Sequence, residues 1–148
     1  MIERIEGNDP FILQELIALD AQAFGAGGMS EWQLMPLIRH GQVHSIRREA
    51  KIAGAVQYMR DWHRPHMAYM VGLAVEESWR GQGIATELLQ GSFSLLRQQG
   101  MQSVELTVAP SNLVARKLYE DKLGFVSTGY SENEFGAGEH RIILSLML

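Results

Sequence analysis

The chain contains no cysteine, and this absence removes several kinds of chemistry at once. A protein without cysteine forms no disulfide, holds no metal through thiolates and has no thiol nucleophile. The sequence also lacks an excess of positive charge, because 13 Lys and Arg stand against 17 Asp and Glu, for a net charge of −4. A nucleic-acid partner is therefore not expected, since binding to a phosphate backbone depends on a surplus of basic side chains.

Long apolar runs and a leader pattern are missing as well. No stretch approaches the ~20 apolar residues of a membrane span, and the first residues, Met1 to Arg4, do not resemble a signal peptide. We therefore expect no membrane association and a cytoplasmic location. The 148 residues, of which 46% are hydrophobic, are enough for a sizeable core, so residues 1–148 are expected to form a single domain.

Apolar periodicity and turn residues predict a mixed α/β chain. In chain order we expect a strand over 2–5, a helix from Pro10, a Gly-rich loop at 25–28, a helix over 30–38, a hairpin of strands over 43–48 and 52–59, a strand over 66–75, a helix over 82–99, a strand over 104–108, a short helix over 113–119, and strands over 126–130 and 141–146. The 66–75 strand has little polar content and is expected in the centre of the sheet, where Gly72 indicates a bulge or a close backbone approach. The Gly-rich loop either borders a substrate site or is a plain connector.

The most informative stretch is the turn Arg80-Gly81-Gln82-Gly83-Ile84-Ala85. It follows an apolar strand and directly precedes the pattern of a helix. Glycines permit strained backbone angles, and the unpaired N–H groups at a helix start attract an anion, to which Arg80 adds a full positive charge. The arrangement predicts a cradle for a pyrophosphate.

Other nucleotide-binding patterns fit this turn less well. A dinucleotide-binding motif needs a third glycine, where this chain has Thr86, and an acidic residue closing the next strand, whereas Glu105 lies inside that strand. A nucleoside-triphosphate loop needs Gly-Lys-Ser/Thr, which does not follow. A nucleotide-binding redox domain nevertheless stays open as a competing class, and it predicts binding of NAD.

The segment 71–125 resembles the GNAT superfamily, the Gcn5-related N-acetyltransferases that use acetyl-CoA. The turn at 80–85 matches the family's Gln/Arg-x-x-Gly-x-Gly/Ala signature. Asn112, Ala115 and Tyr119 match its Asn-x-x-Ala-x-x-x-Tyr helix, and the residues 123–125 match the Leu-Gly-Phe that follows. The ending, residues 135–141, is loosely similar to the last hairpin of the ribosomal-protein N-terminal acetyltransferase branch.

This resemblance implies a fold and a cosubstrate. The fold is α/β of the α+β kind, with a mixed, mostly antiparallel sheet of about seven strands, flanked by about four helices and splayed between the strands ending at Val75 and Val108. Acetyl-CoA is then expected in the V-shaped gap. By this resemblance, the residues that pair with the pantetheine arm are Leu73, Ala74 and Val75. Those that hold the pyrophosphate are Arg80, Gly81, Gln82, Gly83, Ile84, Ala85 and Thr86. The other side of the CoA is lined by Asn112 and Ala115.

An amine that attacks the thioester must lose a proton, although its pKa is ~8 for an α-amine and ~10.4 for lysine. The resemblance makes Tyr119 the acid for the departing CoA thiolate, a role that suits a phenol of pKa ~10. A backbone N–H near Val75 is the expected donor to the oxyanion. Tyr69 occupies a position where the family often has its base, and it could orient a water. Another branch has its base at the position of Thr107, which cannot act as one.

Alternatives for the base and the acceptor stay open. Glu76 or Glu105 could take the proton, or an amine of low pKa could need no base. The acceptor could be a protein N-terminus or lysine, which the hairpin similarity favours, or a small amine such as a polyamine, an amino acid or an aminoglycoside. A non-catalytic acyl-CoA-binding sensor on the same fold is the second class of function. Trp32 and Trp62 are core or loop anchors that could also form a wall for the substrate.

Two further expectations concern metals and assembly. His63 and His66 flank a short loop, but no third ligand lies at a metal-binding spacing, so no metal is expected. The final strand, residues 142–148, is apolar enough to join a sheet across a homodimer.

Overall fold

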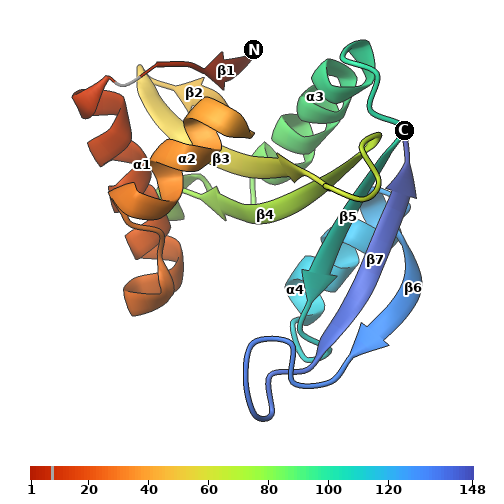
Figure 1. Ribbon diagram of the computed structural model, residues 1–148. Helices are drawn as coiled ribbons and strands as arrows, with labels where there is room; N and C mark the ends of the chain where they lie inside the picture. Colours follow the sequence, from red (N-terminus) through yellow and green to blue (C-terminus); the bar gives the residue numbers. More distant parts are fainter. Residues whose placement is uncertain (8) are drawn as a thin grey trace.

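The computed structural model describes residues 1–7 and 9–148. These residues form a seven-stranded sheet in the order β1-β2-β3-β4-β5-β7-β6, flanked by helices α1 to α4 (Figure 1). The elements are β1 (Ile2–Ile5), α1 (Pro10–Phe24), α2 (Glu31–His40), β2 (Gln42–Arg48), β3 (Lys51–Arg60), β4 (Met67–Val75), α3 (Ile84–Gln98), β5 (Ser103–Val108), α4 (Leu113–Arg116), β6 (Val126–Ser131) and β7 (Arg141–Met147), with short helical turns η1 (Gly25–Gly27), η2 (Glu77–Trp79) and η3 (Lys117–Lys122). Neighbouring strands are antiparallel except β4 and β5, which are parallel. The expected fold class is confirmed.

Helices cover both faces of the sheet. On one face, α1 and α2 bury side chains such as Leu16 and Leu34 against β2 and β3. On the other face, α3 buries Leu88 and Leu89 against β3, β4 and β5. Alternate strand residues serve the two cores, as expected when successive side chains of a strand point to opposite faces.

Local signals explain where the first helices begin. The Asp9 side chain accepts a hydrogen bond from the Phe11 N–H at 2.9 Å, and Pro10 occupies the first helical position. The Gln33 side chain accepts from the Ser30 N–H at 2.9 Å, which forms the predicted capping box of α2. This helix continues to His40, two residues beyond the predicted end, because Gly41 is the first residue to leave the helical conformation.

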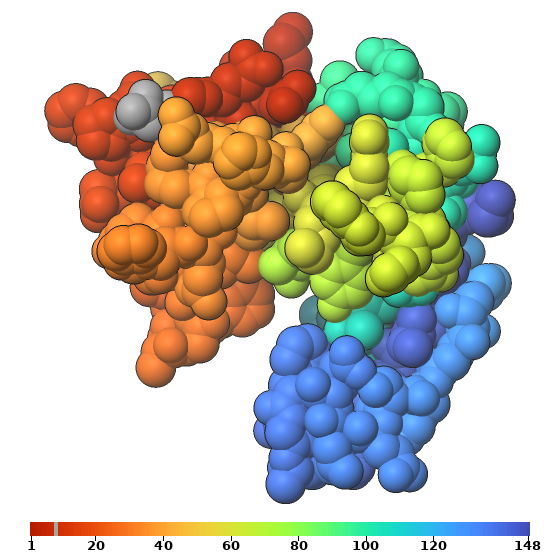
Figure 2. All heavy atoms as spheres, in the orientation of Figure 1, coloured from red at the N-terminus to blue at the C-terminus, as the bar shows by residue number. Residues whose placement is uncertain are grey.

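The sheet opens between β4 and β5. These strands pair only from Met67 with Ser103 to Tyr69 with Glu105, and beyond that point they separate. The opening is visible in Figure 2 as a notch between the orange atoms of the α1–α2 region and the blue atoms of the β6–β7 region. The splay therefore lies between the two strands that the family resemblance named.

A bulge bends β4 at the start of the opening. Gln57 of β3 lies opposite Gly72, but the next residue, Tyr58, lies opposite Met70, so Val71 is the extra residue. A Cβ on Gly72 would come within 2.8 Å of the Gln57 side-chain oxygen. The expected bulge at Gly72 is confirmed, and the close neighbour of this glycine is a side chain rather than another backbone.

The C-terminal strand has no free edge. β7 is hydrogen bonded to β5 on one side and to β6 on the other. The prediction that this strand extends a sheet across a dimer is therefore wrong, because it needs an unpaired edge. In the described part of the chain, none of the helices combines the length and the apolar character needed to cross a bilayer.

Candidate active site

A cavity of about 520 Å³ lies where β4 and β5 part. Its wall joins both strands to the end of α1, the turn after η2, the segment around α4 and the start of β7. The lining residues are Ala23, Phe24, Met70, Val71, Gly72, Leu73, Ala74, Val75, Arg80, Leu106, Thr107, Val108, Ala109, Asn112, Val114, Ala115, Leu118, Tyr119 and Arg141. The wall is mostly apolar, so the few polar groups in it determine what chemistry it can support.

β4 presents a backbone edge to this cavity. On the opposite edge, the N–H of Glu76 donates to the Ala53 carbonyl at 2.8 Å. Because N–H and C=O groups alternate between the two sides of a strand, the backbone groups of Leu73 and Val75 face the gap, while those of Ala74 face β3. Arg80 Nε donates to the Val75 carbonyl at 3.0 Å. Two of the three predicted pantetheine-pairing residues thus offer backbone groups to the cavity.

The glycine turn has the strained backbone that its sequence predicts. Gly81 and Gly83 have φ angles of +75° and +80°, and an added Cβ would meet no atom within 4 Å at either position. The two glycines are therefore needed for backbone conformation rather than for space. The helix begins at Ile84 rather than at Gln82, and its first internal hydrogen bond runs from the Glu87 N–H to the Gly83 carbonyl at 3.0 Å.

The backbone N–H groups of residues 84–86 come before this first bond, so they have no acceptor within the helix. The Gln82 side chain donates to the Ser78 carbonyl at 3.0 Å and holds the turn against η2. The N–H groups at the start of α3 and the neighbouring Arg80 are therefore the groups available for the predicted anion cradle.

Asn112 has a structural reason for its spacing from Ala115. Its side-chain oxygen accepts a hydrogen bond from the Ala115 N–H at 3.2 Å and caps α4. Both residues line the cavity opposite β4. The Asn-x-x-Ala pattern therefore serves helix capping and cavity formation together.

Tyr119 lies in the wide turn η3, which continues α4 directly. The Leu123 N–H donates to the carbonyl of Leu118, five residues earlier, at 3.1 Å. The Tyr119 ring packs edge-on against Phe125, with 5.6 Å between ring centroids, and is only 9% exposed. Burial raises the pKa of Tyr119 to about 12, so the phenol keeps its proton at neutral pH.

Tyr69 and Thr107 meet at the vertex of the opening. The Tyr69 hydroxyl oxygen lies 3.3 Å from the Thr107 hydroxyl oxygen. Tyr69 belongs to the last β4–β5 pair before the strands part, and Thr107 lines the cavity just beyond it. The fold thus brings Tyr69, the residue predicted to orient a water, into contact with Thr107, which stands 38 positions away where another branch of the family has its base.

Neither alternative carboxylate lines the cavity. Glu76 accepts hydrogen bonds from Ser78, which lower the pKa of Glu76 and make it a weaker base. Glu105 forms an ion pair with Arg64 at 3.3 Å. Among the described residues, the cavity wall contains no carboxylate and no imidazole. The structure therefore does not support Glu76 or Glu105 as a base in direct contact with a bound amine.

Sequence reasoning missed Phe24 and Arg141 as wall residues. Phe24 ends α1, and Arg141 begins β7, where its guanidinium lies 4.9 Å from the ring centre of Phe135 and bonds to Glu139 at 3.2 Å. Both reach the cavity only because the sheet order brings distant segments together. No local pattern around either residue could have shown this.

Comparisons with known proteins agree with this geometry. N-alpha-acetyltransferase 30 of Schizosaccharomyces pombe is 38% identical over 77 residues, which cover 51% of each chain. The [ribosomal protein bS18]-alanine N-acetyltransferase of Haemophilus ducreyi is 33% identical over 85 residues, covering 55% of this chain and 58% of the relative. The chain thus spans about half the length of these curated relatives. A Bacillus subtilis acetyltransferase crystallised in complex with CoA has the same fold, with a TM-score of 0.79 and 21% identity over 99% of this chain and 97% of that one.

The sequence profile of the Acetyltransferase (GNAT) family matches residues 13–125, which include α3, the opening between β4 and β5, and Tyr119. This match spans most of the chain and both motifs that carry the resemblance. The chain belongs to the acetyltransferase (GNAT) family.

Proposed function

We propose that residues 1–148 form a single acetyltransferase domain that moves an acetyl group from acetyl-CoA to a primary amine, with both substrates bound together. One observation carries this proposal: the sheet opens beside the Gly81–Gly83 turn, and Tyr119 lines the opening. Acetyl-CoA supplies an acyl group already activated as a thioester. A free strand edge, a cradle of N–H groups and a cavity between them are what a long, anionic thioester requires.

In this proposal each group has a separate binding task. The backbone of Leu73 and Val75 pairs with the pantetheine arm, as an added strand would. Residues 80–86 hold the pyrophosphate, and Asn112 and Ala115 line the other side of the CoA. The B. subtilis acetyltransferase of the same fold was crystallised with CoA, which supports the choice of cosubstrate.

Two tyrosines perform the proton work that we propose. Tyr119 donates a hydrogen bond to the sulfur as it leaves, which lowers the barrier by stabilising developing negative charge. Tyr69, together with Thr107, orients a water that accepts the proton of the amine. Two of the curated relatives are named as an N-alpha-acetyltransferase and as a ribosomal-protein alanine N-acetyltransferase, which favours a protein α-amine, whereas a third is named L-2,4-diaminobutyric acid acetyltransferase and keeps a small amine as the alternative acceptor.

Calorimetric titration with acetyl-CoA tests the first half of the proposal, with NAD as the control ligand. We expect one saturable site for acetyl-CoA and none for NAD. Release of CoA thiol is then followed with a pool of peptides and with a mixture of small amines. A protein that binds NAD but not acetyl-CoA would overturn the assignment.

The lack of a carboxylate or imidazole in the described cavity wall favours a second candidate, a non-catalytic acyl-CoA sensor. A sensor would bind acetyl-CoA with normal stoichiometry and release no thiol with any amine. Its acetyl-CoA affinity would also change little on removal of the Tyr119 hydroxyl, so turnover and not binding separates the two candidates.

A further inference from the structure

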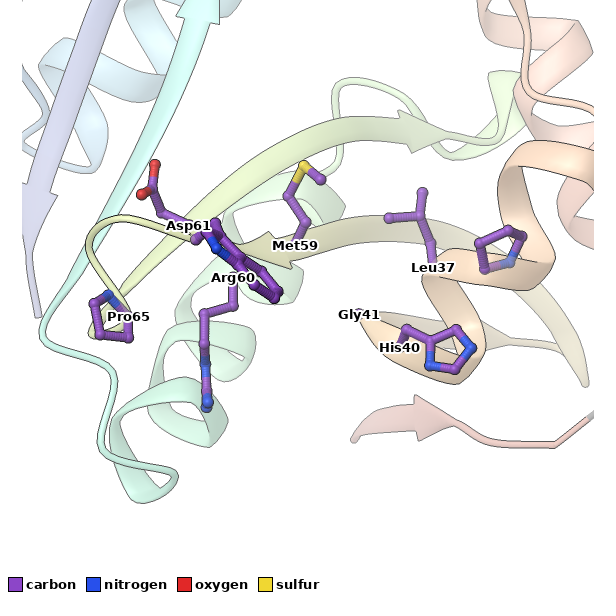
Figure 3. A pocket seen from close by; sticks show the side chains of 9 residues that line it. Leu37, His40, Gly41, Met59, Arg60, Asp61 and Pro65 are labelled. Atoms are coloured by element: carbon purple, nitrogen blue, oxygen red, sulfur yellow. The ribbon is translucent and has the colours of Figure 1, made fainter.

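A groove at the end of the sheet where α2 leads into β2 and where β3 ends has no place in the chemistry above. It consists of two adjoining hollows that share no lining residue with the cavity between β4 and β5. The first, of about 590 Å³, lies between α2 and the loop that follows β3 (Figure 3). The second, of about 280 Å³, shares His40, Gly41, Met59 and Arg60 with the first and reaches Leu96 and Met101 on the α3 side of the sheet. We call the two together the α2–β3 groove.

The first hollow is apolar and open to solvent. Leu37 and Met59 point toward one another across it in Figure 3. Trp62, in the loop after β3, also lines this hollow. Trp62 is 93% exposed and Met59 is 48% exposed. Large exposed apolar side chains gathered around a hollow mark binding surfaces for other molecules.

The second hollow is positively charged, although the chain as a whole carries a net charge of −4. Arg4, Arg39 and Arg60 line it. Arg4 has a partner, Glu6, at 3.6 Å, whereas neither Arg39 nor Arg60 forms an ion pair within residues 1–7 and 9–148. The side chain of Arg60 points away from the apolar hollow in Figure 3. Apolar surface on the α2 side and cationic surface on the α3 side therefore follow one another around the end of the sheet.

The one carboxylate that lines the apolar hollow is already neutralised by its own loop. Asp61 accepts the N–H groups of His63 and Arg64 at 2.8 and 2.7 Å and pairs with the Arg64 guanidinium at 3.4 Å. Arg64 also reaches Glu105 of β5 at 3.3 Å. These bonds fix the loop against the sheet, so the groove has a firm wall and a net positive end.

The groove leads to the vertex of the active site. Met59 lies directly opposite Tyr69 in the β3–β4 ladder, and opposed residues of an antiparallel pair present neighbouring side chains on one face. Tyr69 in turn contacts Thr107 in the cavity wall. A chain whose amine lies at that vertex can therefore continue past Met59 into the apolar hollow and then into the cationic one.

We propose that the α2–β3 groove binds the residues that follow the amine of a polypeptide N-terminus, and that it selects apolar side chains first and acidic side chains next. This inference rests on the proposed acetyl transfer and names its substrate class. A single groove that leaves the vertex in one direction suits an N-terminus, whereas a lysine has chain on both sides. Opposite charge favours acidic residues beside Arg39 and Arg60, because like charges brought together there are repelled.

The experiment compares three peptide pools with the same mixed first residue. In the first pool two leucines and then two glutamates follow, in the second two leucines and two lysines, and in the third two serines and two glutamates. Thiol release gives kcat/KM for each pool. We expect the first pool to exceed each of the others by about tenfold or more, which corresponds to ~1.4 kcal/mol.

Variants assign the preference to the groove. Arg60→Glu should reverse the order of the glutamate and lysine pools, and Trp62→Ala should remove the advantage of leucine over serine. Arg97→Glu on the exposed end of α3 makes the same charge change outside the groove, and it should alter neither preference. Acetyl-CoA affinity, measured by calorimetry, should be unchanged in all three variants.

The outcomes separate the two proposals. Equal turnover of the three pools, or preferences that survive both groove variants, overturns the groove assignment and leaves acetyl transfer intact. Turnover of small amines but of no peptide does the same. Failure to bind acetyl-CoA removes the proposed function, and the groove assignment falls with it.

Discussion

Replacing Tyr119 by phenylalanine removes the hydroxyl of a residue that lines the cavity and keeps the ring that packs on Phe125. The variant should bind acetyl-CoA as tightly as the parent protein and transfer the acetyl group about 100-fold more slowly. Its melting temperature should change little, because the apolar contacts of the ring remain.

The magnitude follows from the pKa of the phenol. Burial raises the pKa of Tyr119 to about 12, whereas an ordinary thiol has a pKa of ~8.5. Complete proton transfer to a thiolate would thus be uphill by roughly 5 kcal/mol. The hydroxyl therefore acts mainly as a hydrogen-bond donor to developing charge, which is worth about 1.5–3 kcal/mol, or roughly 10- to 150-fold in rate.

The assay is thiol release under single-turnover conditions, so that product departure does not mask the chemical step. Tyr130→Phe, which removes a hydroxyl from the half-exposed ring of a β6 tyrosine outside the cavity wall, is the matched control. Because the pKa of Tyr119 lies near 12, its ionisation should produce no falling limb in the rate between pH 7 and pH ~10. A Tyr119→Phe rate within about threefold of the parent would refute the reasoning.

Three further predictions test the fold and the site. Burial lowers the pKa of His44 from 6.5 to about 4, so the unfolded chain binds this proton more readily than the folded one. The contribution of neutral His44 to stability is therefore complete above pH ~6.5, and roughly 3 kcal/mol is lost as the pH drops toward 4. Urea unfolding at several pH values should show this loss, and His44→Gln should reduce it. Gly83→Val should cost about 1–3 kcal/mol and weaken acetyl-CoA binding at least tenfold, whereas Gly100→Val, at a similar φ of +84° away from the cavity, should cost stability alone. With an N-terminal peptide, kcat/KM should rise with pH up to the amine pKa of ~8, and a plateau already reached at pH ~6.5 would indicate an unrecognised base.

Much of the candidate site could be predicted because its parts are local. A positive φ at Gly81 and Gly83, and the start of α3 behind them, are consequences of a few adjacent residues. The same holds for Asn112, whose side chain caps its own helix. Such features are specified by short-range backbone chemistry, so a sequence pattern carries them.

The remaining features depend on which strands lie side by side. The contact between Tyr69 and Thr107 joins residues 38 positions apart, and the ion pair that ties Arg64 to Glu105 joins residues 41 positions apart. Periodicity gives each strand its inner and outer faces, but it does not give the register between β4 and β5 that aligns Tyr69 with Glu105. The prediction of a dimer joined through the final strand failed for the same reason, since an apolar final strand can equally be an interior one.

The register between β4 and β5 also links the vertex of the active site to the wall of the α2–β3 groove. β4 and β5 are held together only over residues 67–69 and 103–105, and the Arg64–Glu105 ion pair lies at the end of that contact. This contact fixes the vertex, while the strands beyond it are unpaired and border the cavity. The loop that supplies Arg64 also supplies Trp62, so the residues that hold the vertex together also form a wall of the α2–β3 groove. A change at Arg64 should therefore disturb peptide selection and the geometry at Tyr69 together, whereas a change at Trp62 should disturb selection alone.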